Sequence, residues 1–552
     1  MNNKIFLIVT FYCCTVVLQA QDLKTTEIRV TESFVPSIPE ATKLNEQATF
    51  SDTAKVDKTQ QYGVSKHSLK SNYKTRPLKA AKVKAETISK LYKNKVSIGT
   101  GFRIGTKAYI IHNSKRSKTL NYGILLNHFN NNVKIDDKLA GKSNNNLHLY
   151  VKKIKKEKIY IANLDYERVG AFTYGNGKTK NGNFDNSITK NNPFYNRFSY
   201  TKFSITRRSI GIDLNKMIRN ATFFISDLNE MSENQIHLSA DLSKEINGLP
   251  INLEIELNNY LNYSNKDCNC ESSDVKSLSL LPSSAFTRYG IDFDIGLELH
   301  YLSDNIPLQI SPQLKATKEL VKDILLIYGG IRNNEQRNTL KSLSDENPYI
   351  HSFGTNQSIV KNNGFNQQLE TTDLQELFLA IRNVLGKDEV FYGSVAYGNV
   401  TNLAYFDLLE TIDYSRFAVN YVDVAQLHIN ANYDKRINNL VSLNINTNYY
   451  HWDKEIYHKP NLTFDISAPI NLRDKIKLMP RVSYLGNRNS LNGTSSEILP
   501  SQIHFNLGLQ YNYSKILSAY LQLNNLTNSK KELWRNYQEI SFNGVFGVSY
   551  SF

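Results

Sequence analysis

The 552-residue chain is basic, with 66 Lys and Arg against 51 Asp and Glu and a formal net charge of +15. Its mean hydropathy is −0.43, and beyond the N-terminal segment no run approaches the ~18 consecutive apolar residues of a transmembrane helix, which excludes a helical membrane protein. The Lys and Arg are spread along the chain, so the charge predicts a solvated surface that attracts anionic lipid headgroups and no nucleic-acid partner.

The N-terminus has the pattern of a secretory signal peptide. Lys4 precedes an apolar run from Ile5 to Leu18, and small Ala20 follows before a polar sequence. This pattern predicts export, with cleavage after Ala20 and removal of residues 1–20. Bulky residues precede Cys13 and Cys14, so we expect no lipid anchor.

Residues 21–92 form the next segment and are rich in Lys, Thr, Ser, Glu and Gln. Such a composition buries too little apolar surface to fold alone, which predicts a flexible N-terminal arm in the periplasm. One patch within it alternates like a strand: Glu27, Ile28, Arg29 and Val30. Two interpretations stay open, a strand that joins the sheet edge of a periplasmic partner and an ordinary tethered terminus.

From about Val96 to the end, apolar and polar residues alternate in successive segments. The strand period of two places one face in an apolar phase and the other in water or a polar lumen, and 33 Tyr and 26 Phe fit such strands. Towards the C-terminus the links between segments alternate in length, as in up-and-down outer-membrane barrels. Short links are expected at 384–388, 433–440, 469–474 and 514–515, and long links at 401–415, 450–460, 485–501 and 525–538.

These patterns predict an all-β fold, a transmembrane antiparallel up-and-down β-barrel over residues 93–552. Each strand with its share of turn and loop takes ~20 to 30 residues, which implies roughly 16 to 22 strands and a lumen too wide for its own side chains to fill. A soluble β-sandwich is the alternative, but it has no reason to sort its loops by length.

The last strand carries Phe546, Val548, Tyr550 and Phe552 on one face. A terminal aromatic on such a strand resembles the signal by which the barrel assembly machinery recognises its substrates. With this strand ending on the periplasmic side, all the long links fall outside the cell.

No chemical motif is complete in the sequence. Cys268 and Cys270 lack the further ligands of a metal site, although a loop disulfide between them stays open. The run from Gly170 to Thr179 has Phe172 where a phosphate loop needs its first glycine, and His451 and His458 share no enforced face. We therefore expect no catalytic residue, cofactor or metal, and no enzyme.

Several stretches resemble TonB-dependent receptors of the Bacteroidota type, in a short form without a recognisable plug domain. They are residues 27–30 with 34–41, 325–331, 344–349, and 523–528 with Trp534 and Tyr537. The resemblance implies an outer-membrane barrel for energised solute uptake, in which Glu27–Val30 would act as a TonB-box-like strand, and the ordinary tethered terminus stays open as the alternative. The ~70 residues before the barrel are too few and too polar for the family's globular plug.

Together these features predict solute uptake or passage across the outer membrane of a Gram-negative bacterium. Two alternatives remain, a passive porin and a surface scaffold or subunit that works with a lipoprotein. Expected partners are outer-membrane lipid, the barrel assembly machinery, and TonB or a surface lipoprotein. The solute and the contents of the lumen are left open.

Overall fold

The computed structural model describes residues 91–552 except 116, 176–191, 193, 211–217, 229–232, 263–273, 304–307, 351–368, 409–415 and 494. All described residues belong to one compact unit, Thr87–Phe552. The expected signal peptide, the arm with Glu27–Val30, and Cys268 and Cys270 lie outside the described residues. None of the described helices is long and apolar enough to cross a membrane.

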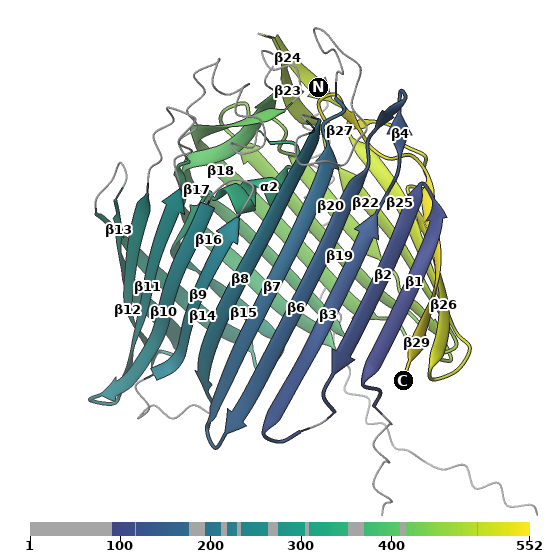
Figure 1. Cartoon of the computed structure of the whole chain (residues 1–552). Helices are drawn as coiled ribbons and strands as arrows, with labels where there is room; N and C mark the ends of the chain where they lie inside the picture. Colours follow the sequence, from purple (N-terminus) through teal and green to yellow (C-terminus); the bar gives the residue numbers. More distant parts are fainter. Residues whose placement is uncertain are drawn as a thin grey trace, which may run out of the picture. The chain divides into compact units, whose positions relative to one another are not determined.

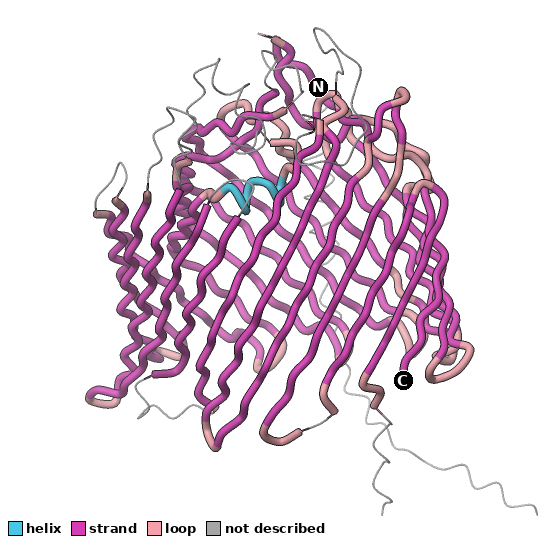
Figure 2. The backbone as a smooth tube through the Cα atoms, in the orientation of Figure 1, coloured by secondary structure: helices cyan, strands magenta, loops and turns pink. Residues whose placement is uncertain are grey.

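The described unit is a closed antiparallel β-barrel of 22 strands (Figures 1 and 2). Each strand pairs with the next along the barrel wall, and β20 and β21 count as one strand because both pair with β22 and are separated by only Ala468 and Pro469. Pro469 has no N–H to donate to a neighbouring strand, which interrupts the ladder at this point. The upper end of the predicted range, 22 strands, is therefore confirmed.

The barrel strands are β1 (Asn94–Phe102), β2 (Ile104–Asn113), β3 (Leu120–Asn130), β6 (Lys142–Lys155), β7 (Lys158–Phe172), β8 (Tyr195–Ser209), β9 (Ile218–Leu228), β10 (Glu233–Ile246), β11 (Leu249–Asn262), β12 (Val275–Arg288), β13 (Ile291–Leu302), β14 (Gln309–Val321), β15 (Leu325–Arg337), β16 (Thr371–Gly386), β17 (Glu389–Leu408), β18 (Phe417–Arg436), β19 (Ser442–Trp452), β20 (Leu462–Ser467), β21 (Ile470–Leu472), β22 (Ile476–Leu485), β25 (Gln502–Asn512), β26 (Leu517–Asn524) and β29 (Asn543–Ser551). The links carry β4 (Lys134–Ile135), β5 (Lys138–Leu139), α2 (Leu340–Glu346), β23 (Arg488–Asn492), β24 (Ser495–Leu499), β27 (Glu532–Trp534) and β28 (Tyr537–Gln538).

The barrel closes where β1 pairs with β29, from Lys95 opposite Ser551 to Phe102 opposite Gly544. The two backbones approach closely at this seam. A Cβ on Gly101 would overlap the carbonyl oxygen of Gly544, so the absence of a side chain is what permits closure here.

The outer face is apolar and the inner face is polar. Ile98, Leu377 and Tyr397 are each about 60% exposed on the outside, in the band where a membrane barrel contacts hydrocarbon. In the last strand Phe546, Val548 and Tyr550 point outward with Phe552, whereas Gly547 and Ser549 are buried on the inner side. The predicted alternation of this segment is confirmed.

In the C-terminal half of the barrel the links are sorted by length between its two ends. We call the end that carries Asn94 and Phe552 the turn end and the opposite end the loop end (Figure 1). In the C-terminal half, turns of two to five residues join β16 to β17, β18 to β19, β21 to β22 and β25 to β26 at the turn end, while the other links are longer. The predicted sorting is confirmed, but the predicted 401–415 loop is partly wrong because β17 continues to Leu408. At the loop end the single residue Arg103 joins β1 to β2.

Candidate functional site

Loop-end segments from around the barrel wall meet in one packed layer, which we call the loop cap. Its hydrophobic core comes from the links that follow β7, β15 and β26 and from the ends of β17 and β18. The end of β7 and the start of β18 lie on nearly opposite sides of the 22-strand ring, and the contacts from Tyr174 through Tyr537 to Phe417 join them, so the cap crosses the lumen. The buried core consists of Ala140, Ala171, Tyr174, Phe198, Leu228, Leu340, Leu343, Tyr349, Ile350, Leu369, Ala404, Phe406, Phe417, Val419, Trp534 and Tyr537.

Helix α2 lies in the link between β15 and β16 and begins with a capping box. The Thr339 hydroxyl accepts from the N–H of Ser342 at 3.1 Å, and the Ser342 hydroxyl accepts from the N–H of Thr339 at 3.0 Å. These bonds satisfy donors that a helix start leaves unpaired. The N–H of Leu340 donates to a carboxylate oxygen of Glu233 on β10 at 2.8 Å, which fastens the helix start to a distant strand.

Further contacts hold α2 to the opposite part of the wall. The Lys341 Nζ lies 2.7 Å from Glu167 on β7 and 2.5 Å from Asp345 within the helix. The Asn196 Nδ2 on β8 donates to the carbonyls of Pro348 and Ile350 at 3.0 and 2.9 Å. The segment that follows α2 is therefore fixed to β8 by an amide that is fully buried.

Aromatic rings form the centre of the cap. Tyr349 and Tyr537 stack with centroids 3.8 Å apart, and Tyr174 meets Tyr537 edge-on at 5.0 Å. Phe417 lies 5.8 Å from Tyr537 and 5.7 Å from Trp534. Burial raises the pKa of the Tyr349 and Tyr537 hydroxyls well above the ordinary value, so both stay neutral and the cap core carries no phenolate charge.

His458 is buried in the same layer, in the link between β19 and β20. Its Nδ1–H donates to the carbonyl of Phe406 at 2.8 Å, and its Nε2 accepts from the N–H of Arg535 at 3.4 Å. Burial lowers its pKa to about 4, and the charges of Arg488 and Arg535 act in the same direction. The ring is therefore neutral at physiological pH, and both of its nitrogens are occupied.

Beneath the cap, a cavity of about 320 Å³ opens where the inner wall of β22, β25, β26 and β29 meets the link between β26 and β29. It is large enough for a small polar solute, at the low end of usual ligand pockets. Its lining mixes aromatic, amide and charged groups: Ala140, Lys142, Tyr174, Tyr349, Ser483, His504, Asn506, Asn524, Asn525, Leu533, Trp534, Tyr537, Gln538, Glu539, Ile540 and Asn543.

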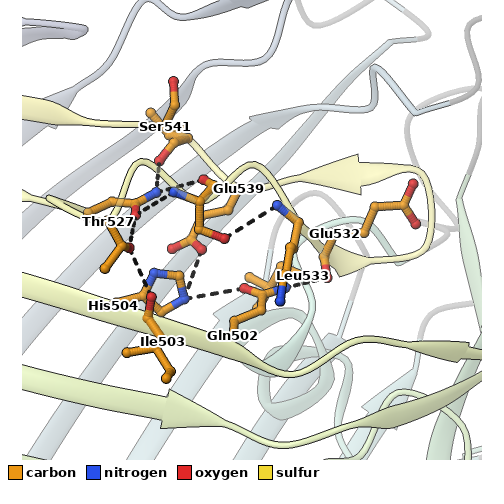
Figure 3. Close-up of polar contacts among 12 residues, drawn as sticks. Gln502, Ile503, His504, Thr527, Glu532, Leu533, Glu539 and Ser541 are labelled. Carbon is orange, nitrogen blue, oxygen red and sulfur yellow. Dashed lines mark hydrogen bonds and ion pairs between the residues drawn. The ribbon is translucent and has the colours of Figure 1, made fainter.

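His504 on β25 and Glu539 after β28 face each other at one side of this cavity (Figure 3). The His504 Nε2 lies 2.9 Å from a Glu539 carboxylate oxygen and 3.2 Å from the Gln502 side-chain oxygen. The Gln502 Nε2 in turn donates to the carbonyl of Glu532 at 2.6 Å. This network anchors the last long link to the wall and fixes the position of Glu539, the one carboxylate among the described residues that line the cavity.

A second cavity of about 410 Å³ adjoins the first, and both are lined by Ser483, His504, Leu533 and Glu539. It continues along the inner face of β19 and β20, where Asn446, Asn448 and Asp465 line it, and the charge of Asp465 is paired with that of Arg481 at 2.7 Å. Asn448 donates to Asn446 at 3.0 Å and accepts from Asn430 at 2.8 Å. The lumen wall next to the cavities is therefore made largely of hydrogen-bonded amides.

The wall on the other side of the barrel is acidic. The register of β10 to β13 places eight carboxylates on the inner face, and no Lys or Arg of these four strands shares that face. Their neighbours Ile236, Leu238 and Leu297 point outward. The eight carboxylates of this inner face are Glu233, Asp241, Glu245, Glu254, Glu256, Asp292, Asp294 and Glu298. Within the described part of the chain, no group of three or more His, Cys, Asp or Glu side chains is arranged to hold a metal ion.

The structure separates the residues of the other motifs. His451 lies at the end of β19 with an exposed side chain, whereas His458 is buried in the cap, so the two do not form one site. At Gly170 a Cβ would overlap the Tyr195 hydroxyl. Close packing against Tyr195 therefore accounts for the glycine at this position.

Sequence reasoning missed the cavity. His504 and Glu539 are 35 positions apart in the sequence, and Lys142 comes from the other end of the barrel domain. A usable signal was present in the last long link, where Trp534 and Tyr537 are large aromatics in a segment otherwise rich in polar residues.

No protein-family model matches the sequence, and no curated protein matches it either. Solved structures match at the level of the fold. A mutant of the ferric enterobactin receptor PfeA from Pseudomonas aeruginosa aligns with a TM-score of 0.60 at 13% identity, over 83% of this chain and 80% of the receptor. The siderophore receptor PirA from Acinetobacter baumannii gives 0.59 at 10% identity, over 85% and 81%. PirA from P. aeruginosa gives 0.55 at 14% identity, over 83% and 79%.

The chain therefore shares the barrel fold of these siderophore receptors, at low sequence identity.

Proposed function

We propose that this protein is a gated outer-membrane barrel for solute uptake, in which a solute is held in the cavity beneath the loop cap before it passes through the lumen. The observation that carries the proposal is the cap itself, because Tyr174, Tyr537 and Phe417 form a continuous ring contact across the loop end. A passive porin keeps an aqueous channel open, whereas a packed layer over the lumen fits a pathway that opens and closes.

Conductance in planar lipid bilayers tests the gate. We expect the wild-type barrel to stay mostly closed and a Tyr537→Ala, Phe417→Ala double variant to show frequent, larger openings, because both truncations leave unfilled volume in the cap core. A Tyr397→Ala variant, which removes an exposed ring from the outer face, is the matched control. A large steady conductance in the wild type, unchanged in the double variant, would establish the passive porin instead.

The energised part of the proposal concerns Glu27–Val30, which we propose to act as a TonB-box-like strand of a periplasmic arm. Strand addition uses backbone N–H groups, so Ile28→Pro should abolish it while Ile28→Val should not. The measurement is binding of the purified full-length proteins to the C-terminal domain of TonB from the same cell. Equal binding by both variants would leave the segment as an ordinary tether, and capture of a stoichiometric lipoprotein through the loop end would favour the scaffold alternative.

A further inference from the structure

The cavity beneath the cap presents hydrogen-bonding groups of both kinds. The hydroxyl of Ser483 has no hydrogen-bond partner among the described residues, and a hydroxyl both donates and accepts. Asn506 accepts the N–H of Asn525 at 2.9 Å, which leaves its amide nitrogen as a donor. Asn524 donates to Asn543 at 2.9 Å, which leaves its side-chain oxygen as an acceptor. A ligand that fills this cavity must therefore both donate and accept.

The charges that line the cavity offset one another. Among the described residues of its lining, Lys142 is the only Lys and Glu539 the only carboxylate, and their opposite charges attract. The Lys142 Nζ lies 4.9 Å above the Tyr349 ring, and Glu539 is engaged with His504. A cationic ligand would meet Lys142 and an anionic ligand would meet Glu539, so neither sign is favoured.

Aromatic side chains supply the rest of the lining. Tyr174, Tyr349, Trp534 and Tyr537 border the cavity, and the adjoining amide-lined cavity shares four residues with it. Aromatic surfaces bury the apolar faces of a ring, while the amides and the hydroxyl satisfy polar groups at its edge. Two joined cavities offer room for more than one such ring.

From these three observations we propose that the site binds an uncharged, polyhydroxylated solute of the carbohydrate class, with about one ring in the first cavity and further rings along the amide wall of β19 and β20. A hydroxyl donates and accepts at the same atom, so a polyol satisfies every group named above, whereas an ammonium only donates and a carboxylate only accepts. This inference rests on the proposed function, since it names the class of solute that the cavity holds.

Binding is measured on the purified full-length barrel in detergent. The chain has only two Trp, so a Trp452→Phe background leaves Trp534 as a fluorescent reporter in the cavity wall. The probes are a panel of neutral oligosaccharides built from glucose, mannose, galactose, xylose or N-acetylglucosamine, with tri-lysine and citrate as charged comparisons. We expect a saturable change in Trp534 emission with at least one neutral oligosaccharide, and none with the charged probes at the same concentration.

Asn506→Asp removes the side-chain N–H donor of Asn506 and keeps a side-chain oxygen that can accept the N–H of Asn525. It should weaken saccharide binding at least tenfold, because the ligand loses a donor and meets a carboxylate. Asn121→Asp, on β3 near the turn end where Asn121 bonds the Ser117 carbonyl, makes the same chemical change away from the cavity and should leave binding unchanged. Ser483→Ala provides a second test should Asn506→Asp fail to give a heat-modifiable, folded barrel.

Three results would overturn the inference: no binding by any neutral oligosaccharide, charged probes that bind as tightly as the best saccharide, or equal effects of the two Asp variants. Failure of the proposed function is a separate result. Conductance that appears in the cap variant with no saccharide binding removes only the carbohydrate assignment, whereas saccharide binding without any conductance in any variant removes the transport role.

Discussion

Acid should loosen the loop cap through His458. The pKa of this imidazole is lowered from 6.5 to about 4 in the closed cap by burial, so the closed state binds its proton less readily than an opened cap with a hydrated ring. The contribution of the neutral His458 to the stability of the closed cap, relative to the opened cap, is fully present above pH 6.5 and is lost as the pH falls towards 4. Between pH 7 and pH 5 the loss is about 2 kcal/mol, close to a 20-fold increase in the opening equilibrium.

Hydrogen–deuterium exchange of peptides covering 455–460 and 532–540 measures this opening. Rates at pH 5 and pH 7, corrected for intrinsic exchange, should differ about 20-fold in the wild-type reference. Burial raises the pKa of Glu233 to about 7, so this carboxylate titrates within the same window and its protonation favours the closed cap. Glu233→Gln is therefore introduced into both the wild-type reference and the His458 variant. Lys341, whose pKa is raised, and Arg488, whose pKa burial lowers to about 10, keep their charge throughout.

His458→Asn is the deciding variant. Its side-chain amide can donate to the Phe406 carbonyl in place of Nδ1, and Asn tolerates the left-handed backbone found here, with φ at 60°. This variant does not titrate, so its cap should open equally at pH 5 and pH 7. An unchanged pH dependence in the variant, or no pH dependence in the wild-type reference, would refute the role given to His458.

Three other predictions follow from the barrel wall. Gly101→Val should prevent closure of the β1–β29 seam, seen as loss of the heat-modifiable band on electrophoresis, because its side chain has no space beside Gly544. In the cap-opened barrel, Glu254→Gln should reduce the preference for cations in reversal-potential measurements, whereas Lys244→Gln on the outer face should not; equal shifts would contradict the acidic-wall assignment. Removal of Phe552 should lower the amount of assembled barrel in the membrane several-fold if it belongs to the assembly signal, and normal assembly would argue against that role.

Local patterning was enough to predict the wall of the barrel. Phe546, Val548 and Tyr550 could be placed on the outer face because a strand alternates with a period of two whatever surrounds it. The alternation of short and long links likewise follows from the order of residues along the chain, and the sheet closes between β1 and β29 with the strand number at the top of the expected range.

The cap and its cavity depend on contacts between residues far apart in the sequence. Tyr174 meets Tyr537, Glu233 holds the start of α2, and His504 faces Glu539. Links of this kind carry no periodic signal, because their conformation is set by which distant surface each one packs against. The sequence by itself determined that this chain forms a large barrel with its long links at one end; only the tertiary structure decided that those links cross the lumen and enclose a polar cavity.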